Sequence, residues 1–480
     1  DTIANALERG ESGTPTMVAN GALNLDAPNI VNTGIVSSKT DNIDIATRAV
    51  GGLGTIAIGS SGGTYSALNG DINIGNSNLT NFDSIILEGG NYLSKNVNIN
   101  AGDGAANGHV GQLTGQLRTS AREAHLGAST DNLQIGTTIC TGDPTFFNAG
   151  GTITIQGDLI FGEAIAILAS ADVTDAANAF SIISTVGKSV NIVAGGLITA
   201  AGGAVGSNTA SPGKQIIAGT VTVNGASSTG GNIVLGASNI STFNGTGGGD
   251  VNLIAFRGST VGSGKVTVAS VTTGSTGADS GDVTVIAGAN TGVGINLITD
   301  LDSSGGATGG NVSLTTSQPT GKVTFDVFGN ATGLFKAGKV IEASSITAPQ
   351  LKTGGGNVLM KSNGVVTLDN FGTSTDSKVS GRSGGNITIT ANKVSILGAV
   401  SADGFDGLTG TAGTADKAAG AGTAGSAGGN ITINTAVSHT ATAGLLMTSR
   451  GGDGGNGGAA FVPPAASGIA GGAGGAGGAG

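Results

Sequence analysis

The chain has 480 residues, of which 92 are glycine, 20 are Lys or Arg and 30 are Asp or Glu. Glycine is far above its ordinary share of about 7%, and charged residues are far below about 25%. These proportions exclude a charge-driven disordered chain, and most of the sequence lacks the period of three that collagen needs. The formal net charge of −10 argues against nucleic acid as a partner. No apolar run approaches the roughly 18 residues of a membrane helix, so we expect no transmembrane segment.

The first residue is Asp1, from which we expect that a secretory signal has been removed. Cys140 is the single cysteine, so no disulfide can form within the chain. We interpret Cys140 as a small buried apolar residue. These features predict a secreted, extracellular or cell-surface protein.

The first 150 residues divide into two segments. Residues 1–100 form an N-terminal β-rich segment, with strand-like stretches such as Ala22–Leu25. Residues 101–150 are the least repetitive, and we expect an irregular excursion there that acts as a lid or contact surface. The best helical pattern of the chain, Gln116–Leu126, lies in this excursion, with Gly127 as its expected stop.

Residues 151–400 carry the clearest internal repeat. The unit is Gly, then Asn or Asp, then alternating aliphatic and polar residues, which predicts a turn followed by a half-buried strand. Examples are Gly249–Leu253, Gly281–Val285, Gly310–Leu314, Gly356–Met360, Gly385–Ile389 and Gly429–Ile433. Recurrence of one turn signature with inward aliphatic residues favours an all-β fold, a parallel β-solenoid in which each coil buries its face on its neighbours.

The spacing of the repeat leaves the coil length open. The unit recurs at short steps between Asn232 and Asn311, and at longer steps such as Asn357 to Asn386. One coil therefore takes either a single step of about 15 residues or a double step of about 30 residues. In either case, we expect the Asn and Asp residues that follow the glycines to stack as a ladder. Aromatic residues recur in the later half and have two interpretations, as fillers of the solenoid core or as unstacked core residues: Phe325, Phe328, Phe335, Phe371 and Phe405.

The C-terminal part is rich in Gly and Ala. Residues 401–450 are expected to hold a Gly/Ala loop, Ser401–Gly429, followed by the last strands. Residues 451–480 form a Gly-rich tail, for which two interpretations stand open: a flexible tether, or packed extended helices of the polyproline type. Gly451–Asn456 also resembles one turn of a calcium-binding nonapeptide repeat.

Residues with catalytic or metal-binding chemistry are sparse. His109, His125 and Cys140 are a conceivable three-ligand metal set. His439 is far from them, and surface or core histidines are the simpler interpretation. A polysaccharide-active enzyme needs aromatic platforms and clustered carboxylates, yet the chain has no Trp, two Tyr and carboxylates dispersed over turns. We therefore predict no catalytic, cofactor-binding or metal-binding residues, no cofactor, and no enzymatic activity.

Two stretches, Ala22–Ser38 and Gly385–Thr390, resemble filamentous-haemagglutinin-type repeats, and the similarity extends loosely over residues 20–440. The resemblance implies a secreted bacterial surface protein with a right-handed parallel β-helix, used in adhesion or extracellular structure. The N-terminal secretion domain of that family is not seen, and the Gly/Ala tail departs from it.

A solenoid exposes a strand edge at each end, and an uncapped edge pairs with another chain. We therefore predict an extracellular structural protein that assembles head to tail into fibres or a surface or matrix layer, as a homopolymer. Strands near residues 16–25 are expected to dock on the C-terminal coils of the next subunit. The alternative is a monomeric adhesin stalk whose residues 101–150 bind a host or neighbouring-cell ligand. A β-helix enzyme acting on polysaccharides is a third, less favoured interpretation.

Overall fold

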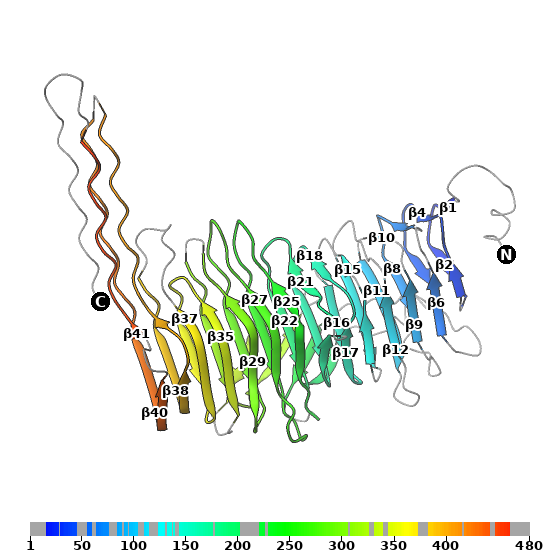
Figure 1. Ribbon diagram of the computed structural model, residues 1–480. Helices are drawn as coiled ribbons and strands as arrows, with labels where there is room; N and C mark the ends of the chain where they lie inside the picture. Colours follow the sequence, from blue (N-terminus) through cyan, green and yellow to red (C-terminus); the bar gives the residue numbers. More distant parts are fainter. Residues whose placement is uncertain are drawn as a thin grey trace.

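The computed structural model describes most of the chain between residues 16 and 460. The described ranges are 16–27, 29–45, 55–59, 64–75, 84–88, 91–94, 96–103, 110–114, 123–129, 132–136, 138–139, 144–175, 178–201, 220–225, 229–305, 308–325, 331–338, 344–372, 383–414, 417–441 and 447–460. Every regular element in them is a β-strand, and most strands lie side by side along an elongated body (Figure 1).

The body is a three-sided parallel β-solenoid. Face 1 is a column of fourteen strands joined by thirteen successive parallel pairings. Its strands are β2 (Leu23–Leu25), β5 (Ile43–Ile45), β8 (Ile72–Gly75), β11 (Asn96–Asp103), β13 (Glu123–Ser129), β16 (Pro144–Asn148), β19 (Ile165–Ala169), β22 (Val190–Ala194), β26 (Val251–Ala255), β28 (Val283–Ala287), β30 (Val312–Thr316), β36 (Val358–Lys361) and the first halves of β38 (Ile387–Ile396) and β40 (Ile431–Ala441).

The second strand of each coil forms face 2. It contains β3 (Asn29–Val31), β6 (Thr55–Gly59), β9 (Ser84–Glu88), β12 (Val110–Thr114), β14 (Asn132–Ile135), β17 (Thr152–Ile155), β20 (Val173–Asp175), the first halves of β25 (Ile233–Ser241), β27 (Val266–Thr272), β29 (Val293–Asp302), β35 (Ser345–Lys352) and β37 (Val365–Gly372), and the second halves of β38 and β40.

Face 3 is described in two stretches, which complete every coil except the one that contains β11 and β12. The first stretch contains β1 (Thr16–Ala19), β4 (Ile35–Ser38), β7 (Thr64–Ala67) and β10 (Asn91–Ser94). The second contains β15 (Thr138–Ile139), β18 (Leu159–Phe161), β21 (Ser181–Ser184), the second halves of β25, β27, β29, β35 and β37, then β39 (Val400–Ser401) and β41 (Met447–Thr448).

The register settles the coil length in favour of the double step. Ile43 pairs with Ile72, whereas Ala124 pairs with Pro144, so the shorter coils take about 20 residues and the longer ones about 30 residues. A single step of the repeat leads from a strand of one face to a strand of the other, because the Gly-Asn/Asp turn precedes strands of both face 1 and face 2. Still longer steps mark insertions, and the longest step between paired face 1 residues runs from Val190 to Val251.

Period-2 alternation fills the solenoid core with aliphatic side chains, as predicted. Ile387 and Ile389 have 0% of their surface exposed, whereas Thr388 is half-buried and Thr390 is exposed. Burying one such side chain contributes about 1.5–3 kcal/mol. Because coil after coil repeats this pattern, the apolar core runs along the whole body.

Two expectations for residues 101–150 are wrong. The strands described there pair in parallel with adjacent coils, so this part belongs to the solenoid and is not an excursion from it. Glu123–Leu126, the end of the expected helix, lies in strand β13, and residues 116–122 lie outside the described part. Parallel pairing with strands of the adjacent coils therefore overrides the weak helical pattern.

The predicted Asn/Asp ladder is present at the start of the face 1 strands. Each side-chain Oδ1 accepts the backbone N–H of the ladder residue in the next coil, at 2.7–2.9 Å. Neighbouring Asn amides also donate to the same oxygen at 3.2 Å. The ladder therefore satisfies a turn N–H that no sheet bond reaches. Its members are Asp250, Asp282, Asn311, Asn357, Asn386 and Asn430.

A reciprocal pair of hydrogen bonds closes the loops that lie just before the ladder. The hydroxyl of Thr273 donates to the carbonyl of Gly281 at 2.7 Å, and the N–H of Gly281 donates back to the carbonyl of Thr273 at 2.9 Å. Ser303 with Gly310 and Thr353 with Gly356 repeat the arrangement. Because the pair closes the neck of the loop, loops of different length leave the solenoid at this corner without disturbing the coil.

The longest described excursion from this corner is a bundle of three extended segments at the C-terminal end, which projects away from the body (Figure 1). We call residues 402–414, 417–429 and 449–460 segments A, B and C of the bundle. Every third backbone N–H of segment A donates to a carbonyl of segment C. In the same way, N–H groups of segment C donate to carbonyls of segment B, and N–H groups of segment B donate to carbonyls of segment A. Examples are Gly407 to Asp453, Gly455 to Thr423, and Thr423 to Leu408. A three-residue repeat with bonds only between segments is the polyproline II pattern.

Glycine permits this packing. A Cβ on Gly407 would lie 1.9 Å from the carbonyl oxygen of Thr423, and one on Gly455 would lie 2.0 Å from that of Leu408. The described part of the Gly-rich tail, Gly451–Ala460, therefore adopts the packed alternative and not the tether. Residues 461–480 lie outside the described part.

The second appended element, the side layer, covers the outside of face 1 at β22, β26 and β28. It is an antiparallel sheet of β23 (Leu197–Ala201), β24 (Thr220–Asn224), β32 (Lys322–Phe325) and β33 (Ala331–Thr332), beside the short pair β31 (Pro319–Thr320) and β34 (Lys336–Ala337). It encloses a separate apolar core with Phe256, Phe325 and Phe335. Phe325 and Phe335 thus fill this core and not that of the solenoid. Phe371 lies in β37 and Phe405 is buried at the base of the bundle, while Phe328 lies outside the described residues.

Candidate functional site

Of the three histidines and Cys140, the structure describes His125 and His439. His125 lies in β13, opposite Asn98 and Thr145 of the adjacent coils, and His439 lies far away in β40 opposite Val394. His109 and Cys140 fall outside the described residues. Across the described ranges, no three His, Cys, Asp or Glu residues are placed to hold a metal ion.

The stretch that resembles a calcium repeat, Gly451–Asn456, belongs to segment C of the bundle. Its Gly452 and Gly455 lie where a Cβ would collide with carbonyl oxygens of segment A. The N–H of Asp453 donates to Oδ1 of Asp406 at 2.7 Å. Close packing of polyproline-type segments accounts for the glycine spacing here.

Among the described residues, we find no helix with the length and apolar character that crossing a membrane requires.

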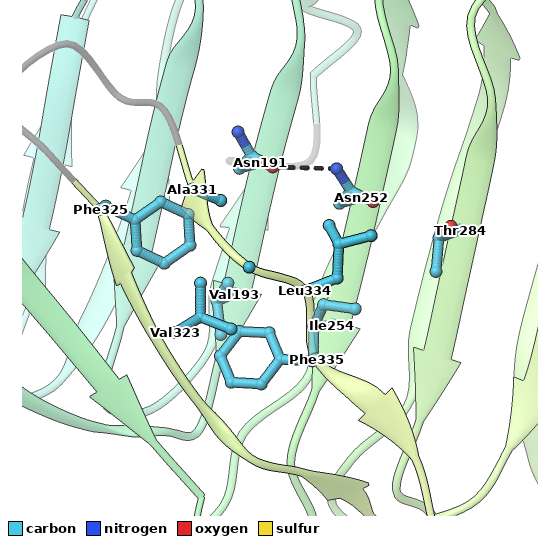
Figure 2. Close-up of a pocket in the computed structure, with 11 residues that line it drawn as sticks. Asn191, Val193, Asn252, Ile254, Thr284, Val323, Phe325, Ala331, Leu334 and Phe335 are labelled. Carbon is cyan, nitrogen blue, oxygen red and sulfur yellow. Dashed lines mark hydrogen bonds between the residues drawn. The ribbon is translucent and has the colours of Figure 1, made fainter.

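The side layer forms a small pocket with face 1, of about 360 Å³ including its open mouth. Figure 2 shows Leu334 and Phe335 on one wall and the outward side chains of face 1 on the other. On that face, the Asn252 amide donates to Asn191 Oδ1 at 3.0 Å. Phe256 and Phe335 meet edge to face, with ring centroids 5.3 Å apart. Because most of the lining is apolar and packed, we interpret the pocket as the edge of the side-layer core.

A larger, polar groove of about 1180 Å³, open to solvent, adjoins the side layer where β24, β31 and the turn after β26 meet. Arg257, Gln318, Asn224 and three hydroxyl side chains line it. The Arg257 backbone N–H donates to Gln318 Oε1 at 3.3 Å, and its carbonyl accepts the Ser263 hydroxyl at 2.6 Å. Among the described residues that line the groove, Arg257 has the one charged side chain.

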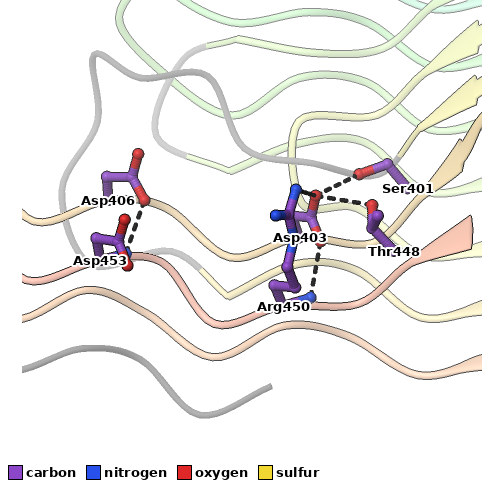
Figure 3. Close-up of polar contacts among 6 residues, drawn as sticks. All are labelled: Ser401, Asp403, Asp406, Thr448, Arg450 and Asp453. Atoms are coloured by element: carbon purple, nitrogen blue, oxygen red, sulfur yellow. Dashed lines mark hydrogen bonds and ion pairs between the residues drawn. The ribbon is translucent and has the colours of Figure 1, made fainter. Parts of the chain in front are cut away.

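The neck of the bundle is organised by one carboxylate (Figure 3). Asp403 accepts the Arg450 N–H at 2.7 Å, the Thr448 hydroxyl at 2.8 Å and the Ser401 hydroxyl at 3.0 Å. The Arg450 guanidinium lies 3.7 Å away but is largely exposed. Burial alone raises the pKa of Asp403, but these hydrogen bonds and the Arg450 charge together hold the pKa below its usual value.

The ladder contains two stacked carboxylates, Asp250 and Asp282. Burial raises the pKa of Asp250, the hydrogen bond from the Asp282 N–H lowers it, and the Asp282 charge raises it again, so that the net shift is upward. All later members of the ladder are Asn, which carry no charge. The function of the ladder is thus structural, and the pair of acids is its least favourable step.

Sequence reasoning missed the side layer and the groove. Their strands come from distant parts of the chain, as Val223 opposite Val323 illustrates, and no local pattern links them. The bundle had a usable signal, because glycine recurs every third residue at Gly404, Gly407, Gly410 and Gly413.

Comparisons with known proteins give no family for this chain: no family model, no curated protein and no solved structure matches it.

Proposed function

We propose that this protein is a non-catalytic structural subunit that assembles head to tail into extracellular fibres or a surface or matrix layer. One observation carries the proposal: the solenoid core is open at both ends of the described chain. Inward residues of the central coils are fully buried, but Leu23 and Leu25 in the first coil and Ile431 and Ile433 in the last remain partly exposed.

The strand edges support the same interpretation. Within the described residues, β2 pairs with β5 alone and the face 1 half of β40 with β38 alone, so each has one unpaired edge. Val31 and Val437, in the terminal coils, are 73% and 74% exposed. An open apolar core with free strand edges binds a complementary edge, and the first coil of one subunit on the last coil of another continues the same parallel stacking.

The resemblance of Ala22–Ser38 and Gly385–Thr390 to filamentous-haemagglutinin-type repeats, together with the β-solenoid, supports placement outside the cell. The alternative function is a monomeric adhesin stalk that binds a ligand through residues 101–150, and it would use a surface of the solenoid itself, because the strands described there pair with adjacent coils.

The test is a charge at the first coil. Leu25→Glu places a carboxylate on the end surface, where solvent tolerates it in the monomer but a docked subunit would bury it. Leu68→Glu is the matched control, since Leu68 is 52% exposed between β7 and β8. We expect Leu25→Glu to abolish filaments while Leu68→Glu keeps them, as scored by negative-stain electron microscopy. Filaments of Leu25→Glu indistinguishable from wild type would contradict the proposal.

A further inference from the structure

Each step of the Asn/Asp ladder joins two successive coils in a fixed register. Oδ1 of Asn386 accepts the backbone N–H of Asn430 at 2.9 Å. The N–H of the next residue, Ile387, donates to the Asn430 carbonyl at 2.8 Å. The same side-chain bond recurs near the other end of the solenoid, where Oδ1 of Asn42 accepts the Asp71 N–H at 2.9 Å. These bonds therefore determine which residue of one coil lies over which residue of the next.

The last described coil leaves one ladder step open. Asn430 is exposed, and among the described residues none donates to its Oδ1. In the first described coil, Ala22 occupies the ladder position, because Leu23 pairs with Ile43 and Asn42 precedes Ile43. The hydrogen bonds that join described residues leave the Ala22 N–H unused. One end of the solenoid thus has the acceptor of a ladder step, and the other end has the donor.

The inward side chains of the two end coils match as well. They are apolar and partly exposed on two faces: on face 1 Leu23 and Leu25 with Ile431 and Ile433, and on face 3 Met17 with Met447. Met447 pairs with the buried Val400, and Met17 pairs with the buried Val36, so both methionines continue inward columns. One further coil-to-coil step would bury both sets of apolar side chains.

We propose that the two ends join in one register, in which Oδ1 of Asn430 accepts the Ala22 N–H of the next subunit. This contact rests on the proposed head-to-tail assembly and makes it specific. In this register the Ile431 N–H donates to the Ala22 carbonyl, and Ile431 stacks on Leu23. A shift by one residue turns the apolar side chains outward. A shift by two keeps them inward but leaves the ladder step unmade, so the ladder contact selects the register.

Disulfide cross-linking of the full chain tests the register. Asn24 and Thr432 are exposed, and in the proposed register they lie opposite each other at about 4.8 Å. In a Cys140→Ala background, we expect Asn24→Cys with Thr432→Cys to form disulfide-linked multimers on oxidation, because this Cα separation suits a disulfide. The control pair, Asn24→Cys with Asn434→Cys, lies about 8 Å apart and should form at least about tenfold less multimer.

A second variant tests the ladder contact itself. Asn430→Ala removes the Oδ1 acceptor and keeps the backbone N–H that donates to Asn386. We expect this change to raise the critical concentration for filament growth about fivefold. Asn357→Ala is the matched control inside the solenoid, where Oδ1 of Asn357 accepts the Asn386 N–H at 2.9 Å. It should leave the critical concentration unchanged.

The outcomes separate the register from assembly as such. Filaments in which the Asn24→Cys and Thr432→Cys pair cross-links no better than the control pair would overturn the register and leave head-to-tail assembly standing. Equal critical concentrations for Asn430→Ala and wild type would overturn the ladder contact. If wild type forms no filaments and neither cysteine pair forms multimers, both the assembly and its register are wrong.

Discussion

Oδ1 of Asp250 accepts the backbone N–H of Asp282 at 2.8 Å, one coil further along the solenoid. The two residues occupy equivalent turns of successive coils, and the same bond recurs with Asn at the later steps. This relationship links the sequence repeat to the fold, because the residue that shapes each turn also joins it to the next coil.

The paired acids at this step give a pH dependence. Because the pKa of Asp250 is raised on folding, the folded state binds more protons than the unfolded state above the ordinary value of about 3.9. Stability therefore falls as pH rises from about 4 through the raised pKa, and the penalty is complete at pH 7. We expect Asp250→Asn to raise the free energy of unfolding at pH 7 by about 0.5 kcal/mol, and to have no such effect below pH 4.

Thermal unfolding at both pH values measures this. The reverse change, Asn311→Asp, stacks a new carboxylate on Asp282 and should destabilise the protein at pH 7 by a similar amount. A Tm for Asp250→Asn below that of wild type at pH 7 would contradict the assignment.

At the neck of the bundle, Asp403→Ala removes the acceptor of three hydrogen bonds. We expect a loss of about 1 kcal/mol, with faster hydrogen exchange at the Arg450 amide. Since the pKa of Asp403 is lowered on folding, this stabilisation is present above about pH 4 and is lost as pH falls through the lowered pKa. Asp406→Asn is the control: an amide oxygen still accepts the Asp453 N–H, so exchange there should not change. Equal exchange in Asp403→Ala and wild type would argue against this role.

The bundle is expected to unfold independently of the solenoid when its glycines are replaced. Gly407→Ala places a methyl group where the Thr423 carbonyl oxygen lies, which costs about 2–3 kcal/mol or more. Hydrogen exchange should show lost protection in segments A, B and C and unchanged protection in the face 1 strands. Thr409→Ala, at an exposed position of segment A, should leave the bundle intact. Retained protection in Gly407→Ala would be incompatible with the polyproline-type packing.

Phe256 anchors the side layer to face 1. It is fully buried and packs edge to face on Phe335, so Phe256→Ala should cost about 3–5 kcal/mol. We expect increased exchange in β24 and β32 before the solenoid core opens. Leu334→Ala, at a side chain 66% exposed, should change stability by less than about 0.5 kcal/mol. Similar exchange in the two variants would show that Phe256 does not hold the layer.

The solenoid was predictable because the same local sequence pattern recurs in coil after coil. Gly385 and Asn386 set a turn, Ile387 and Ile389 point inward, and the same order returns coil after coil. The coil length was not predictable, because Asn232 and Asp250 follow the same kind of glycine turn but precede strands of different faces. The side layer depends on pairing between distant insertions, as at Val223 and Val323, which local patterns do not encode.

Head-to-tail assembly by continued strand stacking is the central claim, and the axial repeat of the polymer tests it most directly. The fourteen described coils, stacked at about 4.8 Å, predict a repeat of about 67 Å per subunit. Electron microscopy of the purified full chain, with averaging along the filament, measures that distance. Filaments with a repeat of about 67 Å are the expected result. Single rods at all concentrations, or filaments with an unrelated repeat, would contradict the claim.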